Sequence, residues 1–391
     1  MRILFSAHPM WSHVMPMIPL ARALQDAGHV VAFSSAPNFD LPSEHGFPLH
    51  GVGPDWNRDP EILRLLSEAQ TYAGPEHAKF MLRQIFAGSS GLRCVPDLQT
   101  LIEDWQPDVV IAESTELAAP SVAERLEIPY AIMTFGVDIP IAVLKALAGD
   151  ARDTLRAAAG LAADPELDAT RRFLRLNFAP PSYQPLATPV SHALRPVPFD
   201  DADRIDLPSW IDDLSDRPIV YATLGMVFAQ NTPLFEAIAD GLRDEDVNLV
   251  ITVGPMVDPT PLCRYADNLH VEHFIPNSLL LPRCAAVVSH AGYGTVMGCL
   301  TLGVPMLLLS LGADHFHHAK RCGELGIATI LEPEECVPER FRQCVREMLA
   351  DPQGLLSLQA IRDEIAALPE LPHAVGLVEQ LAETGNPVYR A

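Results

Sequence analysis

Apolar runs of strand length alternate with helical segments in two separate parts of the chain. The first series begins with "RILFSAH" (2–8), a helix over 15–27 and "VVAFSSA" (30–36). The second begins with "PIVYATLG" (218–225). Repeated strand–helix–strand units predict parallel sheets that helices cover on both faces. We therefore predict an α/β fold with two doubly wound, Rossmann-like domains.

A proline-rich stretch that turns acidic separates the two series. The chain has 391 residues, which suits about two domains of roughly 150–200 residues each. We place an N-terminal domain at 1–199, an interdomain linker at 200–217 and a C-terminal domain at 218–370. Open α/β sheets bind ligands at the carboxyl ends of their strands, so the two domains are predicted to face a ligand-binding cleft.

The composition and charge exclude several classes of protein. The net charge of −23 argues against nucleic-acid and anionic-membrane partners, because these require basic patches. The longest apolar runs are much shorter than the roughly 20 residues of a membrane helix. The N-terminus enters a strand without a secretory signal, so we expect a cytoplasmic protein. The seven cysteines include no C-x-x-C pair, and neither a disulfide framework nor a zinc site is predicted.

The decapeptide "SHAGYGTVMG" (289–298) follows an apolar strand and precedes a helical apolar face. Glycines in a strand-to-helix turn let backbone N–H groups approach a ligand, and Thr295 can cap the helix. The helix start also carries about half a positive charge. The turn is therefore predicted to bind an anion, of which phosphate is the usual example.

Two other interpretations of this turn remain open from the residues alone. The glycines can simply serve a tight turn. Gly292, Gly294 and Gly298, with Asp314 twenty residues after Gly294, also approximate a dinucleotide-binding fingerprint. That fingerprint opens the first strand–helix unit of a nucleotide domain, whereas this turn lies well inside one. The phosphate interpretation is therefore favoured.

A second candidate site combines His13 with Glu113. His13 follows the first strand and precedes its helix, and an imidazole with a pKa of about 6.5 suits a general base. Glu113 ends the strand-like run "DVVIAE", where its carboxylate can orient the imidazole. The alternatives are a packed histidine and a carboxylate facing water. His8, Asp108 and Glu116 are weaker competitors for these roles.

The segment "GADHFHHAK" (312–320) invites a metal interpretation through Asp314, His315, His317 and His318. Among the histidines only His315 and His318 share a helix face, and no second cluster completes a set of ligands. No metal is therefore predicted. A polar rim that hydrogen-bonds a hydroxylated ligand is the simpler interpretation.

Together these segments resemble the family 1 glycosyltransferases of the GT-B fold. The resemblance spans nearly the whole chain and is greatest to the bacterial enzymes that glycosylate antibiotics and other natural products, such as enediynes. The segments that carry it are "SHVMPMIPLARALQDAGHVVAF", "LRPVPF", "VYATLG", "FIPNSLLLPRCAAVVSHAGYGTVMGCLTLGVPMLLL" and "GADHFHHA".

The resemblance implies a role for each candidate residue. His13 would be the general base and Glu113 its support, although aspartate is frequent at the latter position and Ser12 replaces the commoner glycine. The residues implied in binding the donor are His290, Gly292, Gly294 and Thr295 at the diphosphate, Phe274 and Ile275 at the nucleobase, Asp314 at the sugar, and in addition Gly225 and His315. The histidines at 315 and 318 and Met226 depart from the family pattern, which leaves the sugar open.

The implied activity is the inverting transfer of a deoxysugar or other sugar from a dTDP- or UDP-sugar to a hydroxyl of a hydrophobic, polyketide-like aglycone. The nucleotide sugar is a cosubstrate, and no separate cofactor is predicted. The aromatic-bearing, less regular region 53–105 is the candidate acceptor pocket, and residues 371–391 are expected to pack back onto the N-terminal domain. A homodimer is left open. The competing functions are a non-catalytic nucleotide-sugar-binding accessory protein, a sugar-nucleotide epimerase of the same fold and an oxidoreductase.

Overall fold

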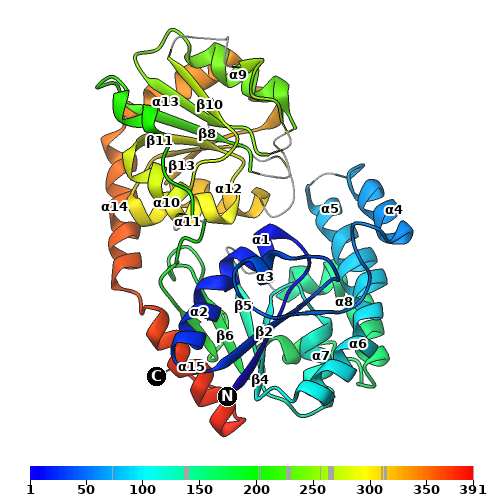
Figure 1. Ribbon diagram of the computed structural model, residues 1–391. Helices are drawn as coiled ribbons and strands as arrows, with labels where there is room; N and C mark the ends of the chain where they lie inside the picture. The colour runs from blue at the N-terminus through cyan, green and yellow to red at the C-terminus, as the bar shows by residue number, and fades with distance from the viewer. Residues whose placement is uncertain are drawn as a thin grey trace. The chain divides into compact units, whose positions relative to one another are not determined.

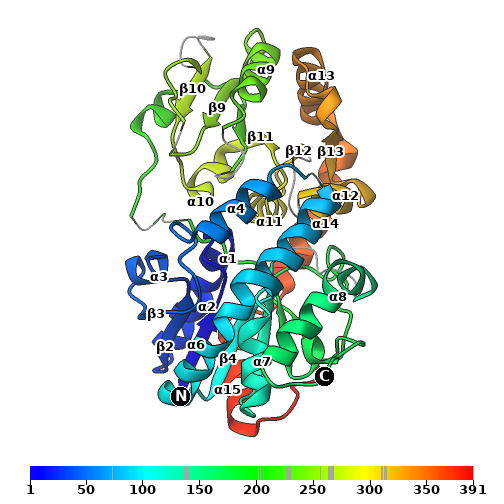
Figure 2. The same ribbon diagram turned by 90° about the vertical axis from the view of Figure 1, so that its right-hand side faces the viewer.

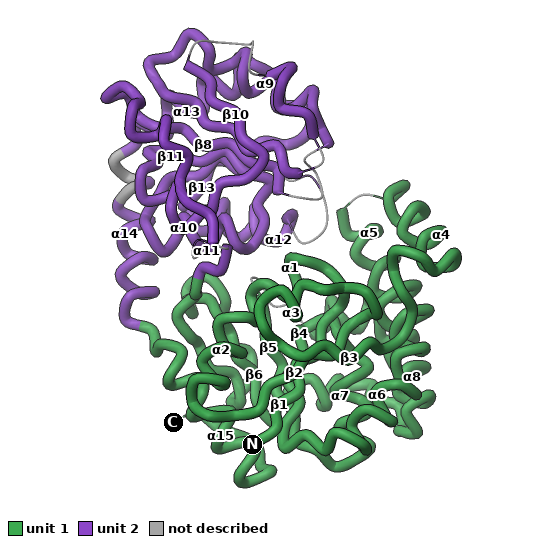
Figure 3. The backbone as a smooth tube through the Cα atoms, in the orientation of Figure 1, with its two compact units in different colours: residues 1–197, 368–391 green, residues 198–367 purple. Residues whose placement is uncertain are grey.

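The chain forms two compact units (Figure 3). In this computed structural model, unit 1 comprises Met1–Val197 and Leu368–Ala391, and unit 2 comprises Pro198–Ala367. The structure describes residues 1–72, 74–135, 141–200, 202, 204–225, 230–255, 257–262, 268–309, 311 and 315–390. The stretch 200–217, which we predicted as a linker, belongs to unit 2 by its contacts with the rest of that unit. Asp200, for example, accepts hydrogen bonds from the backbone and hydroxyl of Ser278.

Unit 1 is built on a parallel sheet with the order β3-β2-β1-β4-β5-β6-β7 among its described residues. The strands are β1 Arg2–Ser6, β2 Val30–Ser35, β3 Leu49–Gly51, β4 Val109–Glu113, β5 Tyr130–Thr134, β6 Leu174–Asn177 and β7 Ser191–Ala193. The order reverses between β1 and β4, which are hydrogen-bonded neighbours. In doubly wound sheets ligands bind at the carboxyl end of such a reversal.

Helices cover both faces of this sheet (Figure 1, Figure 2). On one face α2 (Ile18–Asp26) lies beside the C-terminal helix α15 (Leu371–Thr384). The other face is covered by α6 (Ser90–Trp105), α7 (Ala118–Arg125) and α8 (Ile141–Ala158). The remaining helical segments are α1 Trp11–Val14, η1 Met15–Met17, α3 Leu41–Glu44, α4 Pro60–Ala69, α5 Gly74–Phe80, η2 Met81–Ser89 and η3 Asp168–Arg171.

Burial on both faces explains why the strands of unit 1 are almost continuously apolar. In β1, Leu4 packs into the cluster that contains α6 and α7 residues. Its neighbour Phe5 points to the opposite face, where its ring stacks on that of Phe33 with centroids 5.0 Å apart. Successive side chains of a strand alternate between faces, so a sheet with two covered faces favours apolar residues along its central strands, and the polar Ser6 and Glu113 stand only at the carboxyl ends of β1 and β4.

The region 53–105 is more regular than the sequence predicted, because most of it is helical. A π-helical segment, η2, connects α5 to α6, and Gly88 within it has the non-helical angles φ −88° and ψ −120°. A Cβ atom on Gly91 would lie 2.1 Å from the carbonyl oxygen of Phe86, so this irregular turn requires glycine. Glycines and Pro96 interrupt the 3.6-residue period that marks a helix in a sequence.

Unit 2 contains a second parallel sheet, with the order β10-β9-β8-β11-β12-β13 among its described residues. Its strands are β8 Ile219–Thr223, β9 Asn248–Thr252, β10 Leu269–Glu272, β11 Cys284–Ser289, β12 Met306–Leu309 and β13 Ala328–Leu331. Its helical segments are η4 Ser209–Asp213, α9 Thr232–Leu242, α10 Asn277–Leu280, η6 Leu281–Arg283, α11 Tyr293–Leu302, α12 His315–Glu324, η7 Pro333–Glu335, α13 Pro338–Ala350 and α14 Pro352–Ala367. Here the order reverses between β8 and β11. The predicted fold of two parallel-sheet α/β domains is confirmed.

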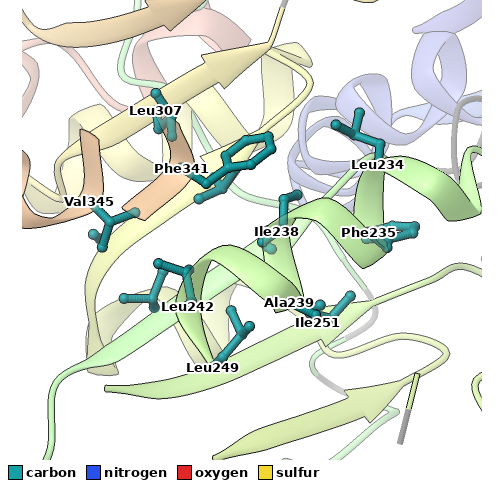
Figure 4. Close-up of a cluster of buried hydrophobic side chains, with 14 of the residues drawn as sticks. Leu234, Phe235, Ile238, Ala239, Leu242, Leu249, Ile251, Leu307, Phe341 and Val345 are labelled. Carbon is teal, nitrogen blue, oxygen red and sulfur yellow. The ribbon is translucent and has the colours of Figure 1, made fainter. Parts of the chain in front are cut away.

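The core of unit 2 lies where α9 and α13 pack together on the sheet (Figure 4). Phe235 and Ile238 of α9 and Phe341 of α13 are fully buried in one cluster. A Cβ atom on Gly241 would lie 2.6 Å from the carbonyl oxygen of Pro338, so glycine permits the close approach of the two helices. Within the described residues, no helix combines the length and apolar character needed to cross a membrane.

Replacing Phe341 with alanine is expected to destabilise unit 2 by about 3–5 kcal/mol, because the ring is fully buried and its loss leaves a cavity. Urea unfolding followed by fluorescence measures this free energy. Leu349→Ala is the matched control, since Leu349 lies on the same helix and is 36% exposed. Equal effects of the two substitutions would contradict the placement of Phe341 in the core.

Candidate active site

His13 and Glu113 meet at the strand-order reversal of unit 1. His13 lies in the short helix α1, which follows β1, and Glu113 is the last residue of the neighbouring strand β4. The ring nitrogen Nδ1 of His13 is 3.0 Å from Oε1 of Glu113. A carboxylate with a strongly lowered pKa can only accept, so Nδ1 carries the proton and donates it to Glu113. The structure thus brings the two predicted residues together.

The surroundings of His13 differ from the sequence prediction in one respect. The helix predicted over 15–27 begins earlier and is divided into α1, η1 and α2. Pro16 and Pro19 stand in the first turns of η1 and α2. Proline has no N–H to donate, so each one interrupts the hydrogen-bond series of a continuous helix. His13 therefore lies within a helical turn rather than in a loop.

Glu113 is ionised because its partners outweigh its burial. The side chain is 1% exposed, and burial alone would raise its pKa. The interaction with His13, including its hydrogen bond, and the backbone N–H of Thr115 oppose this and lower the pKa of Glu113 to about 2. A buried carboxylate that accepts Nδ1–H fixes the tautomer of His13 and makes Nε2 the basic nitrogen. The His13 side chain is 18% exposed, so a substrate can reach it.

The other polar residues near this pair have different roles. His8 donates its Nε2–H to the carbonyl of Thr115 at 3.0 Å, and burial lowers its pKa to about 4, so it is neutral at neutral pH. Asp108 accepts the backbone N–H of Arg2 before β4 begins. Neither residue takes the place of His13 or Glu113.

Glu116 is a second buried carboxyl group, and it binds the start of α7. It accepts the backbone N–H of Ala118 at 2.9 Å and that of Ala119 at 3.0 Å. Burial, followed by repulsion from Glu113, raises the pKa of Glu116 to about 7 in spite of these hydrogen bonds. Two carboxyl groups three residues apart therefore have opposite pKa shifts.

In unit 2, His290 occupies the corresponding strand-order reversal. It follows β11, and its backbone N–H donates to the carbonyl of Thr223 in β8 at 3.3 Å. A Cβ atom on either Gly225 or Gly292 would lie 2.5 Å from Nε2 of His290. A side chain at either position would therefore overlap the imidazole where it lies. The ring of His315 packs edge-on against it at 4.5 Å.

The turn after His290 differs from the prediction for Thr295. Helix α11 begins at Tyr293 with Gly292 as its N-cap, and no side chain caps it. The prediction that Thr295 caps this helix is therefore wrong. Thr295 lies inside the first turn, is 6% exposed, and its hydroxyl accepts a hydrogen bond from Asn277 Nδ2 at 3.3 Å.

The glycines of this turn have different surroundings. A Cβ atom on Gly298 would lie 2.7 Å from Leu281 Cδ1, so Gly298 serves helix packing rather than a dinucleotide. Gly294 is exposed, and a Cβ atom there would meet no other atom within 4 Å. Protein packing therefore does not explain the absence of a side chain at Gly294. Ala291, which precedes Gly292, has φ +64°, a conformation that favours glycine.

Three of the remaining predicted donor residues, Phe274, Ile275 and His315, are among the described residues, and Asp314 is not. Phe274 and Ile275 follow β10, and they are 43% and 1% exposed, respectively. His315 and His318 lie on one face of α12, as the sequence predicted, and both are buried. Asp314 and Met226 lie outside the described residues. In the described part of the chain, no three histidine, cysteine, aspartate or glutamate side chains are grouped as metal ligands are.

Sequence reasoning did not identify two residues that hold the candidate groups. Thr115 contacts Glu113, and Asn277 contacts Thr295. The only signal in the sequence is position: Thr115 lies two residues after the strand-end carboxylate, and Asn277 follows the predicted nucleobase pair. Neither spacing is specific enough to predict a hydrogen bond.

The chain is similar to known proteins over almost its whole length. Residues 22–225 match the family model of the N-terminal domain of erythromycin biosynthesis protein CIII-like proteins, and residues 236–381 match that of the C-terminal domain. The chain is 31% identical to an L-demethylnoviosyl transferase of Streptomyces niveus, over 83% of this chain and 84% of that protein. It is 26% identical to the 3-alpha-mycarosylerythronolide B desosaminyl transferase of Saccharopolyspora erythraea, over 98% of both.

A solved structure shows the same fold. The crystal structure of the glycosyltransferase VinC in complex with dTDP superposes with a TM-score of 0.81 at 27% sequence identity. The match covers 98% of this chain and 100% of VinC.

Replacing Glu116 with glutamine is expected to stabilise the protein at alkaline pH. In the folded state the pKa of Glu116 is raised from 4.5 to about 7, so the stability it contributes is complete below pH 4.5 and is lost as the pH rises through 7. This difference corresponds to about 3 kcal/mol at pH 9. Glutamine stays neutral and can still accept from the start of α7.

Urea unfolding at pH 5 and pH 9 tests this expectation. The variant should be close to the native protein at pH 5 and more stable by about 2–3 kcal/mol at pH 9. Glu103→Gln, at an exposed position of α6, is the control and should show no such difference. An identical pH dependence for the native protein and Glu116→Gln would contradict the raised pKa.

Proposed function

The chain belongs to the erythromycin biosynthesis protein CIII-like family of bacterial antibiotic glycosyltransferases, and we propose that it transfers a sugar with inversion from a dTDP- or UDP-sugar to a hydroxyl of a hydrophobic natural-product aglycone. That the enzyme is a glycosyltransferase follows from the family. The base, the stereochemistry and the substrates are our proposal. The observation that carries it is the hydrogen bond between His13 and the ionised Glu113 at the carboxyl end of β1 and β4.

In the proposed reaction His13 is the general base. Its Nε2 removes the proton of the acceptor hydroxyl while that oxygen attacks the anomeric carbon. The bond from the anomeric carbon to the diphosphate oxygen breaks, and its electron pair leaves with the nucleoside diphosphate. Attack from the opposite side converts an α-linked donor into a β-linked product. Glu113 stabilises the imidazolium that forms, because it already accepts the Nδ1–H.

We assign donor binding to the His290 turn of unit 2. The start of α11 presents backbone N–H groups and the positive end of a helix of ten residues. Gly294 is exposed there, and packing within the protein does not explain why this position has no side chain. The missing side chain leaves room for a diphosphate against the backbone. The net charge of −23 means that this local field, rather than the overall charge, must attract the anion.

The other donor contacts follow the family resemblance. Phe274 and Ile275 are proposed to flank the nucleobase and Asp314 to contact the sugar, with His290, Gly292, Gly294 and Thr295 at the diphosphate. Gly225 and His315 are proposed as further donor-binding residues. Bound dTDP in the similar enzyme VinC supports a thymidine nucleotide. Stabilisation of the departing diphosphate by the helix start and His290 requires neither a metal nor a separate cofactor.

We assign acceptor binding to unit 1, on the side of the base formed by the region 53–105. Phe86 of η2 stacks on His8 at 4.1 Å, and its ring centroid is 6.0 Å from that of His13. Trp56 stacks on Phe86 in turn, with centroids 6.2 Å apart. Apolar and aromatic elements therefore adjoin the base, which suits a hydrophobic acceptor better than a sugar or a peptide.

Replacing His13 with alanine is expected to reduce transfer by about 10²–10⁴-fold, because the acceptor hydroxyl loses its base. The affinity for dTDP should not change, because the nucleotide is assigned to unit 2. Mass spectrometry of products from dTDP- and UDP-sugars with a panel of polyketide aglycones measures transfer, and calorimetry measures binding. His50→Ala, on the edge strand β3, is the control.

The same experiment separates the competing functions. Transfer by His13→Ala at the native rate would refute the proposed base. An accessory protein would bind the nucleotide without turnover, an epimerase would convert the donor without an acceptor, and an oxidoreductase would prefer NAD in a thermal-shift panel.

Replacing Gly294 with alanine is expected to change stability and binding in opposite directions. The position is helical and open, so alanine should stabilise the fold by about 0.5–1 kcal/mol. The added methyl group would occupy the space assigned to the diphosphate, so the affinity for dTDP should fall at least tenfold. Thermal unfolding and calorimetry measure the two effects.

Gly292→Ala provides the contrast, because its Cβ atom would lie 2.5 Å from His290 Nε2 and should destabilise unit 2. Unchanged dTDP affinity in a stable Gly294→Ala protein would rule out diphosphate binding at this turn.

A further inference from the structure

Thr115 holds both oxygens of the buried Glu113 carboxylate. It donates its backbone N–H to Oε2 at 2.7 Å and its hydroxyl to Oε1 at 2.8 Å. The hydroxyl oxygen is also 3.0 Å from Oε2. Because Oε1 accepts the Nδ1–H of His13 as well, Thr115 and His13 bind the same carboxylate oxygen.

A glutamate at this position needs such support more than an aspartate would. Its side chain has one more rotatable bond, and its carboxylate can therefore adopt more orientations around the strand end. Ordering a glutamate side chain costs conformational entropy. The backbone and hydroxyl donors of Thr115 restrict the carboxylate to the orientation that faces His13.

Thr115 is itself held in place from another element. Its carbonyl accepts the Nε2–H of His8, which follows β1, at 3.0 Å. The His8 ring stacks on Phe86 of η2, with an angle of 17° between the planes. His8 Nε2 is 3.8 Å from Glu113 Oε1, beyond hydrogen-bond distance, so its proton is not diverted to the carboxylate. Oε1 therefore remains available for His13.

We infer that Thr115 is a positioning residue of the base dyad, whose hydroxyl keeps Glu113 in the orientation in which Oε1 accepts the Nδ1–H of His13. This inference rests on the proposed role of His13 as the base. Thr115 acts through Glu113 and needs no contact with a substrate. The titratable groups that influence Glu113 here are His8, His13 and Glu116, and the test leaves all three unchanged.

Thr115→Val tests the hydroxyl, because valine has nearly the same shape and preserves the backbone N–H and carbonyl. We expect kcat for transfer to fall about tenfold or more, the effect of removing one hydrogen bond to a charged group. The KM for the nucleotide sugar should not change, because the donor is assigned to unit 2. Thr115→Ser restores the hydroxyl and should restore kcat. Thr115→Ala, which also lacks the hydroxyl, should behave as Thr115→Val does.

A spectroscopic measurement on the full chain without substrate provides a second readout. Nitrogen-15 NMR of the histidine side chains distinguishes rings protonated at Nδ1 from those protonated at Nε2. In the native protein and in Thr115→Ser, His13 should be protonated at Nδ1 with a strongly hydrogen-bonded proton. In Thr115→Val and Thr115→Ala this signal should weaken or shift toward the Nε2 form. His8 is the internal reference, because its bond to the Thr115 carbonyl persists in every variant.

Thr188→Val is the matched control. Thr188 is buried, and its hydroxyl is 2.8 Å from that of Ser191, but it precedes β7 and so lies at the amino edge of the sheet, opposite the dyad. It should leave kcat and the His13 signal unchanged. An intact His8 signal in the Thr115 variants shows that the site is still folded.

Native kcat and a native His13 signal in both Thr115→Val and Thr115→Ala would overturn the inference. Loss of kcat that Thr115→Ser does not restore would do the same, because the hydroxyl would then not be responsible. Failure of the proposed function is a distinct result: His13→Ala would transfer sugar at the native rate, whatever the Thr115 variants show by NMR.

Discussion

Each sheet of this protein is parallel and reverses its strand order once among its described residues, and the positions of the proposed base pair and of the His290 turn depend on these two reversals. At a reversal the connections leave the sheet toward opposite faces, so the carboxyl ends of two adjacent strands remain uncovered. In unit 1 these strands are β1 and β4, which supply His13 and Glu113. In unit 2 they are β8 and β11, which lead to Gly225 and His290. The order of the strands therefore determines where these side chains lie in each unit.

Partners rather than burial alone determine the charge of the groups at the first reversal. Glu113 and Glu116 are almost equally buried, yet their pKa values move in opposite directions. Glu113 faces the imidazole of His13, whereas Glu116 faces backbone N–H groups and the negative charge of Glu113. The imidazole of His13 and several hydrogen-bond donors offset the desolvation of the Glu113 carboxylate, whereas the hydrogen bonds that Glu116 accepts do not offset its desolvation. The protein can thus contain one permanent anion for the dyad and one group that titrates near neutral pH.

At the second reversal, steric fit rather than charge determines which residues can lie next to His290. The imidazole of His290 lies so close to Gly225 and Gly292 that any side chain there would overlap it. Gly294 has no such neighbour, so the glycines serve two purposes: Gly225 after β8 and Gly292 after β11 accommodate a ring of the protein, and Gly294 leaves an open surface. The first purpose is visible only in the structure, since all three glycines look alike in the sequence.

Much of this arrangement could be predicted from the sequence, and the misses have physical causes. Continuous apolar runs predicted central strands because both sheet faces are buried, and strand-end polar residues predicted the His13–Glu113 pair because parallel strands end at one edge. Prolines at 16 and 19 and glycines at 88 and 91 concealed helix boundaries, since they interrupt the period on which such predictions rest. Thr295 was misassigned as a cap because a cap depends on where a helix begins, which neighbouring packing decides.

The sequence by itself determined the α/β class, the two parallel sheets and the residue types at their carboxyl edges, because these depend on local periodicity and on hydrophobic patterning. Only the tertiary structure decided that Thr115 donates hydrogen bonds to Glu113, that His8 binds the carbonyl of Thr115, and that two glycines lie against the ring of His290. Those outcomes depend on distances of a few ångströms, in the case of His8 and Thr115 between residues that are 107 positions apart in the chain, and no local pattern encodes them.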